Sequence, residues 1–386
     1  MSTATTATWP ETDPRRLDVD RLISDPATRV IVCCGAGGVG KTTTAAALAV
    51  RAADLGRTTV VLTIDPARRL AQSLGLSDLD NTPREVEDAG RTGAGRLDAM
   101  MLDMKRTFDE IVLTHAEPGR AQQILANPFY QSLSSSFAGT QEYMAMEKLG
   151  QLVEEDRWDL IVVDTPPSRS ALDFLDAPKR LGSFLDGRLI RMLTAPARKS
   201  GSAFGRVVSS GFGVVNGVLS RILGKSLLGD IQTFVAALDT MFGGFRERAD
   251  RTYRRLAAPG TAFLVVATPE PDALREAAYF VERLDEERMP LAGLILNRVA
   301  RSGYAGISAG RAAAAAEALQ TQAGHGLSAA LLELHAERMQ AVTHDRRMLD
   351  RFVSAHPEVP VAEIPARPVD VRDLPALRDL AAALAG

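Results

Sequence analysis

The chain has 386 residues, of which 46% are hydrophobic and 24% charged, a composition that excludes a wholly disordered, collagen-like or coiled-coil protein. Its formal charge of −3 comes from 45 basic against 48 acidic side chains without a long basic run, so a general nucleic-acid-binding protein is not expected. The length predicts one large domain with an insertion, or two smaller domains.

The N-terminal residues 1–14 are rich in Thr, Ala and Pro, and no basic segment followed by an apolar stretch occurs there. This predicts a disordered arm and no secretory signal. The apolar, charge-free stretch 207–220 is shorter than the roughly 18 residues that span a bilayer. We therefore expect a cytoplasmic protein, in which the adjacent Cys33 and Cys34 are reduced thiols of the core.

Seven short runs rich in Val, Ile and Leu predict buried strands, at residues 29–34, 58–64, 97–102, 160–163, 262–268, 292–297 and 359–364. Most of them precede a helical pattern, as at residues 43–53, 272–288 and 373–385. This alternation predicts an α/β fold with a mainly parallel sheet and helices on both faces.

Two regions interrupt the alternation. Residues 105–155 predict helices broken at Pro118 and Pro128, and residues 172–258 predict a longer helical region without a strand. We expect a single domain over residues 15–386 that carries both regions as an inserted helical subdomain.

A glycine-rich turn follows the first predicted strand and opens a helix. Two glycines with four residues between them precede a Lys and a hydroxyl residue, which is the pattern of a phosphate-binding loop. Backbone N–H groups of such a loop surround an anion, Lys41 adds a point charge, and Thr42 is placed to hold Mg²⁺. The predicted nucleotide-binding residues of this loop are Gly35, Gly37, Gly38, Val39, Gly40, Lys41, Thr42 and Thr43.

Two aspartates follow predicted strands, at the edge where open α/β sheets bind ligands. Asp164 is a candidate for orienting Mg²⁺ or its bound water, and the alternative is that it caps a turn. Asp65 is a candidate for orienting the attacking water. Because Pro66 follows it, the alternative for Asp65 is the N-cap of a helix with Pro at the first position.

Asn297 closes another predicted strand. Its amide both donates and accepts hydrogen bonds, as the edge of an adenine requires, but strand ends favour Asn in any case.

The chain resembles the arsenite-pump and tail-anchored-protein-targeting ATPases in a set of motifs and in their order: Gly37 to Thr44, Asp65-Pro66-Ala67, Asp164-Thr165-Pro166-Pro167-Ser168, Pro269-Glu270 and Asn297. Gly139, Glu142 and residues 369–380 are similar less specifically. The resemblance implies a P-loop ATPase of the deviant Walker A type that closes as a dimer around two ATP molecules with Mg²⁺. It also implies that Asp65 places the water, Asp164 opens the second switch, Asn297 reads adenine and Glu270 faces the partner's nucleotide.

Three departures from the family pattern bear on assembly. Ala36 stands where the family loop has a second Lys that reaches the other subunit's phosphates, which predicts a heterodimer with a related subunit that carries this Lys. The second departure is Arg68, followed by Arg69, in place of the usual His of the first switch. A homodimer stays open if either arginine supplies the missing charge, although a solvated pair of helical arginines is the alternative. The third departure is the lack of a CxxC pair, so we expect neither a zinc-clasped dimer nor a three-cysteine arsenite site.

Residues 201–229 combine apolar side chains at helical spacing with seven glycines, which predicts a mobile apolar surface suited to a client. The alternative is a helical layer packed on the sheet. The predicted function is a Mg²⁺-dependent ATPase that uses dimer closure to handle a hydrophobic client, such as a membrane-protein segment. A nucleotide-binding, weakly catalytic subunit of a heterodimer is the alternative, and an anion-pump or partition-type ATPase is less expected.

Overall fold

The computed structural model describes residues 16–65, 69–90, 95–127, 130–131, 140–166, 247–322 and 324–385. The predicted arm at residues 1–14 and most of the second predicted insertion lie outside these ranges. The chain divides into two compact units. The sheet unit comprises Met1–Met101, Glu155–Leu172 and Arg255–Gly386, and the helical unit comprises Leu102–Glu154 and Asp173–Arg254.

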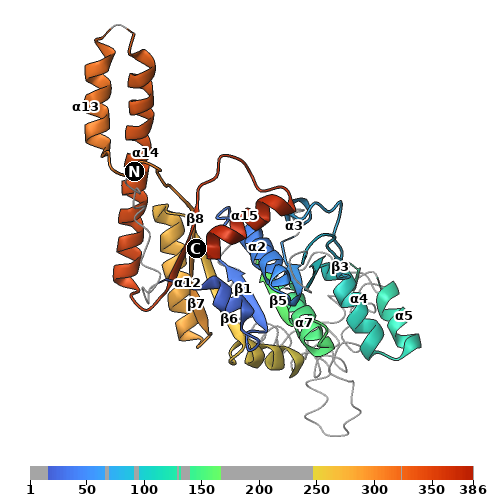
Figure 1. Cartoon of the computed structure of the whole chain (residues 1–386). Helices are drawn as coiled ribbons and strands as arrows, with labels where there is room; N and C mark the ends of the chain where they lie inside the picture. Colours follow the sequence, from blue (N-terminus) through green and yellow to red (C-terminus); the bar gives the residue numbers. More distant parts are fainter. Residues whose placement is uncertain are drawn as a thin grey trace, which may run out of the picture. The chain divides into compact units, whose positions relative to one another are not determined.

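The sheet unit is built on eight strands in the order β3-β4-β2-β5-β1-β6-β7-β8 (Figure 1). Seven of them run parallel to their neighbours, and β3 pairs with β4 in the antiparallel direction. The strands are β1 (Val30–Cys34), β2 (Thr58–Thr63), β3 (Arg84–Glu85), β4 (Arg96–Met101), β5 (Leu160–Asp164), β6 (Thr261–Ala267), β7 (Leu291–Val299) and β8 (Val361–Pro365). The mainly parallel α/β sheet predicted from the sequence is thus confirmed.

Helices cover both faces of this sheet. On one face, α2 (Lys41–Asp54) packs beside α15 (Leu374–Ala385) over a core that also includes side chains of α1 (Val19–Ser24) and α3 (Arg69–Ser73). α2 buries a run of alanines, which allows close approach to the strands. On the other face, α12 (Pro271–Glu286) packs against β6 and β7.

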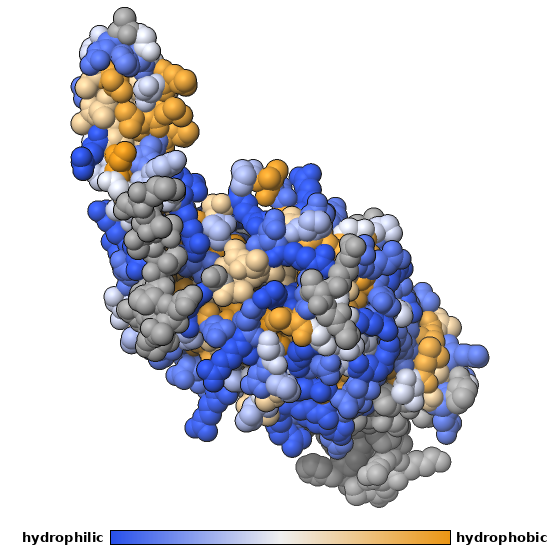
Figure 2. Space-filling model, in the orientation of Figure 1, coloured by the Kyte–Doolittle hydropathy of each residue, from blue (hydrophilic) through white to orange (hydrophobic). Residues whose placement is uncertain are grey.

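Between β7 and β8 the chain forms a helical hairpin of α13 (Ala309–Gln320) and α14 (Gly326–Ala355) (Figure 1). The buried positions of α13 and of the first half of α14 are alanines, whereas Leu327, Leu331 and Leu334 are exposed. Figure 2 shows hydrophobic residues gathered on this part of the hairpin surface. None of the helices within the described ranges combines the length and the apolar character that crossing a bilayer requires.

The helical unit contains α4 (Met104–His115), α5 (Pro118–Ala126) and α7 (Thr140–Glu155), and its residues 247–254 are helical as well. α5 begins at Pro118, where the sequence predicts a break. Two ion pairs are partly buried within this unit: Arg248 with Glu147 at 2.7 Å and Lys148 with Glu110 at 3.1 Å.

A buried arginine fixes the edge of the sheet opposite the carboxyl ends of the strands. The Arg57 guanidinium donates to the carbonyl oxygens of Ile23 (2.8 Å), Asp25 (3.1 Å), Thr28 (2.8 Å) and Asp159 (2.5 Å). It thereby ties the connections that lead into β1, β2 and β5 to one another, and these three adjacent strands carry the loops described next.

Candidate active site

The turn between β1 and α2 has room for glycine alone at two positions. Gly35 has φ +146° and Gly40 has φ +96°, values that residues with a side chain rarely adopt. A Cβ atom on Gly35 would overlap the Val266 carbonyl oxygen of β6, and one on Gly40 would overlap Nδ2 of Asn297. The loop is therefore packed closely onto the ends of β6 and β7, while Gly37 and Gly38 form its exposed outer turn.

Lys41 opens α2 and folds back over the loop. Its Nζ donates to the carbonyl oxygens of Gly35 (2.9 Å) and Ala36 (2.7 Å), and the side chain is buried. Burial lowers the pKa of Lys41, and the carboxylates of Asp164 and Asp65 act in the opposite direction. An ammonium group has three N–H donors, so these two bonds leave one donor for an anion in the loop.

Asp164 is the last residue of β5 and is fully buried. The Thr63 hydroxyl donates to its Oδ2 at 2.8 Å, whereas Oδ1 is buried without a hydrogen-bond partner among the described residues. Loss of solvation raises the pKa of Asp164 to about 6, although Thr42, Thr63 and Lys41 favour its charged form. An orphaned carboxylate oxygen beside the Thr42 hydroxyl supplies the oxygen ligands that Mg²⁺ prefers, so these residues fit that ion.

Asp65 lies next to this group, directly after β2. Its backbone N–H donates to the Thr63 hydroxyl at 3.2 Å, so Thr63 links Asp65 to Asp164. Asp65 is partly buried and lines the same pocket as Lys41 and Thr42. Residues 66–68 lie outside the described ranges, so the N-cap alternative for Asp65 stays a prediction.

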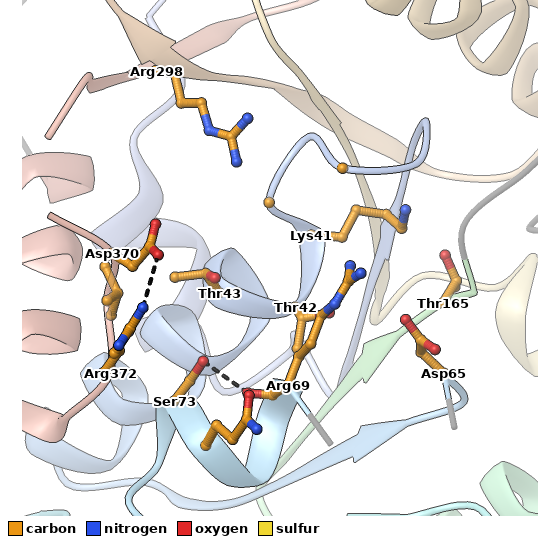
Figure 3. Close-up of a pocket in the computed structure, with 14 residues that line it drawn as sticks. Lys41, Thr42, Thr43, Asp65, Arg69, Ser73, Thr165, Arg298, Asp370 and Arg372 are labelled. Atoms are coloured by element: carbon orange, nitrogen blue, oxygen red, sulfur yellow. Dashed lines mark hydrogen bonds and ion pairs between the residues drawn. The ribbon is translucent and has the colours of Figure 1, made fainter. Parts of the chain in front are cut away.

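Lys41, Thr42 and Asp65 line a pocket of about 800 Å³, a volume within the range that small-molecule sites occupy, whereas Asp164 is not part of its lining (Figure 3). Figure 3 shows Lys41, Asp65 and Thr165 on one side, and Arg298, Asp370 and Arg372 on the other. The pocket is polar and carries more cationic than anionic side chains. Its lining consists of Gly38, Gly40, Lys41, Thr42, Thr43, Asp65, Arg69, Gln72, Ser73, Thr165, Arg298, Asp370, Val371 and Arg372.

Comparison with known proteins gives this pocket a family context. A family model described as anion-transporting ATPase matches residues 28–306, well over half of the chain. The chain belongs to this family. The match includes the glycine-rich loop, both aspartates and Asn297, and it ends before the α13–α14 hairpin.

Three curated relatives show how far the similarity extends. The chain is 31% identical to an ATPase GET3 of Malassezia globosa over 178 residues, which is 46% of this chain and 50% of that protein. It is 31% identical to a putative arsenical pump-driving ATPase of Halobacterium salinarum over 203 residues, covering 50% of this chain and 30% of the relative. ATPase ASNA1 homolog 2 of Paramecium tetraurelia is 24% identical over 282 residues, 72% of this chain and 78% of the relative. The chain thus spans half or less of the first two relatives.

Ala36 is the loop residue on which the predicted heterodimer depends. Its methyl group is covered and packs in the core, so the position brings no charge to the pocket. Arg69, at the start of α3, does line the pocket, as Thr42 does (Figure 3). Arg68, the other candidate cation, lies outside the described residues.

Five predicted nucleotide-binding residues are not among the residues that line the pocket: Gly35, Gly37 and Val39 of the loop, Glu270 and Asn297. Asn297 is buried beneath the loop, and Glu270 is the exposed N-cap residue of α12. Their roles toward adenine and toward a partner's nucleotide stay predictions. Gly139 and the side chain of Glu142 lie outside the described part of the chain.

Sequence reasoning did not single out three cationic or polar lining residues: Gln72, Ser73 and Arg298. The sequence clue to Arg298 was its position directly after Asn297, a predicted site residue. Asp370, Val371 and Arg372 fall in the C-terminal segment 369–380, whose similarity was noted without a role.

The two cysteines are buried free thiols, as predicted. The Cys34 thiol contacts the Leu264 carbonyl oxygen at 3.6 Å, and burial raises the pKa of Cys34 to about 12. They belong to the sheet below the loop and are inert structural thiols.

Proposed function

We propose that this protein is a Mg²⁺-dependent ATPase that binds ATP in the pocket around the glycine-rich loop. The observation that carries the proposal is the convergence of Lys41, Asp65 and Asp164 at the carboxyl ends of three adjacent strands, β1, β2 and β5. Membership of an ATPase family supports it. We further infer that the protein acts in the cytoplasm.

Each residue has a distinct task in this proposal. Backbone N–H groups of the loop and the Lys41 ammonium bind the β and γ phosphates. Thr42 and Asp164 would hold Mg²⁺, which neutralises charge on the phosphate oxygens when bound. Asp65 orients the attacking water, since its carboxylate lines the pocket beside Lys41.

A comparison of binding with turnover tests this assignment. Asp65→Asn should keep the affinity for Mg·ATP and slow phosphate release by a factor of about 100, the usual contribution of a positioned acid or base. Asp350→Asn on α14, which removes an exposed carboxylate paired with Arg346, is the matched control and should change neither quantity. Wild-type turnover in Asp65→Asn would remove this residue from the mechanism.

A second candidate function is that of a weakly catalytic subunit in a heterodimer. The specific observation is the uncharged, covered Ala36 in the loop. A related subunit with Lys at this position would supply the charge to the ATP bound by this chain. In a homodimer, Arg69 would have to act in its place, because of the two candidate cations Arg68 and Arg69 it is the described one and it lines the pocket.

Three activity measurements separate the two assemblies: the isolated chain, its Ala36→Lys variant, and the chain mixed with a Lys-bearing homologue of the same host. The heterodimer requires weak activity of the isolated chain and strong activity of the mixture. Full activity of the isolated chain that depends on Arg69, tested as Arg69→Ala, would instead favour the homodimer.

We also propose that closure of the dimer serves a hydrophobic client. Support comes from the apolar, glycine-rich sequence of residues 201–229, which lie outside the described ranges. Hydrogen exchange over residues 202–231 should slow when Mg·ATP is added. Strong protection without nucleotide would favour the static helical layer.

A further inference from the structure

The end of β7 leaves the regular strand pattern beside the glycine-rich loop. The register between β7 and β8 shifts between Leu296 and Val299. Within this irregularity, Arg298 has φ +62°, a left-handed conformation that is uncommon for a residue with a side chain. Such conformations persist where the surroundings enforce them, and they cluster at functional sites.

Asn297 precedes this residue and is 8% exposed. Its Nδ2 donates to the Val39 carbonyl oxygen of the loop at 2.8 Å, and its Oδ1 accepts from the Arg298 backbone N–H at 2.9 Å. The left-handed turn at Arg298 therefore accompanies a hydrogen bond that orients the Asn297 amide. Both ends of the amide are engaged inside the protein, and Gly40 lies so close that a Cβ atom there would overlap Nδ2.

The contact with Val39 controls a whole peptide unit. In a trans peptide the carbonyl C=O and the following N–H point in opposite directions. Because the Val39 carbonyl is turned toward Asn297, the N–H of Gly40 is turned away from it. Gly40 lines the pocket, and N–H groups that face inward are the anion-binding element of such a loop.

We propose that Asn297 is a positioning residue for the phosphate loop, which aims the Gly40 N–H at the bound phosphates whatever base the nucleotide carries. The inference rests on the proposed nucleotide function and deepens it. It differs from the adenine-reading role that resemblance implies, because it places the effect of Asn297 at the phosphate end.

The test compares three ligands: Mg·ATP, Mg·GTP and inorganic tripolyphosphate. Asn297→Asp has the same shape and keeps the acceptor for the Arg298 N–H, but it loses the donor to Val39. Because the carboxylate also repels phosphates, Asn297→Ala, which loses the same donor without adding charge, is measured beside it and should show the same uniform loss. We expect the affinity of all three ligands to fall by a similar factor, about ten-fold or more. A loss confined to ATP would overturn the inference in favour of adenine reading, and unchanged affinities for all three would overturn it as well.

A second readout separates loop positioning from general destabilisation. The Gly40 amide proton resonance should move strongly when tripolyphosphate binds the wild-type protein and much less in Asn297→Asp at a saturating concentration. Asn81→Asp, at another buried Asn of the sheet unit, is the control for stability and should leave that shift intact. If Asn297→Asp does not fold, Asn297→Ala alone serves in both measurements.

Lys41→Ala in the same titrations separates failure of this inference from failure of the proposed function. A wild-type protein that binds none of the three ligands refutes both. Binding that needs Lys41 but does not respond to Asn297 refutes the positioning role alone.

Discussion

Asp164 holds a carboxyl group in an environment that opposes its charge, and Asp164→Asn should therefore stabilise the protein at neutral pH. Burial raises the pKa of Asp164 from 3.8 to about 6, even with the favourable contributions of Thr42, Thr63 and Lys41 included. A difference of about two pKa units corresponds to roughly 3 kcal/mol of free energy of unfolding.

The sign of the pH dependence follows from proton binding. Because the folded state binds this proton more tightly than the unfolded state, the stability that Asp164 contributes is fully present below pH 3.8 and is lost as pH rises through 6. The amide of Asn does not ionise. Relative to wild type, Asp164→Asn should be about 2–3 kcal/mol more stable at pH 7.5, and this advantage should disappear near pH 4.

Urea unfolding at a series of pH values from 4 to 8, in the presence of EDTA, measures this difference directly. The same variant should lose most of the stabilisation that Mg·ATP gives the wild-type protein, because its neutral amide replaces the negatively charged carboxylate proposed to hold Mg²⁺. An Asp164→Asn protein that is less stable than wild type at pH 7.5, or a difference that does not vary with pH, would refute this account of the carboxylate.

Two further predictions concern the frame that carries the site. Arg57→Met should lower the free energy of unfolding by about 3 kcal/mol or more, because four carbonyl oxygens each lose a hydrogen bond from the guanidinium. Arg29→Met, which breaks an exposed ion pair with Asp156, should cost less than about 1 kcal/mol. Equal losses in urea unfolding would show that Arg57 does not tie the strand connections together. Gly35→Ala should cost about 2–4 kcal/mol, because its Cβ meets the backbone of Val266 in a left-handed conformation, and a thermal midpoint equal to wild type would contradict that packing.

The strands were predictable because of where they lie. A parallel strand that is covered on both faces is a continuous apolar run, and all seven such runs in the sequence form strands. The strand that the sequence did not predict, β3, consists of two exposed residues, Arg84 and Glu85, which carry no such pattern. The full length of α14 also escaped prediction, since much of its surface is exposed and its buried positions near the tip are alanines.

The centre of the candidate site was predictable for a related reason. The glycines and Lys41 of the loop are close together in the sequence and form a recognisable motif. The residues on the far side of the pocket come together through the tertiary fold, which no local motif records. Arg298 and Arg372 come from segments more than 250 residues after the loop. The strand order β1-β6-β7-β8, which continues the sheet from the loop-bearing strand β1, brings them to the same edge.

The central claim is that the glycine-rich loop binds Mg·ATP. Calorimetric titration of the full chain with Mg·ATP should give a binding isotherm for the wild-type protein and for Lys105→Ala, a control that removes an exposed Lys from the helical unit. Lys41→Ala should show almost no heat of binding, because the triphosphate loses its main point charge in the loop. Equal affinity of Lys41→Ala and the wild-type protein for Mg·ATP would contradict the account.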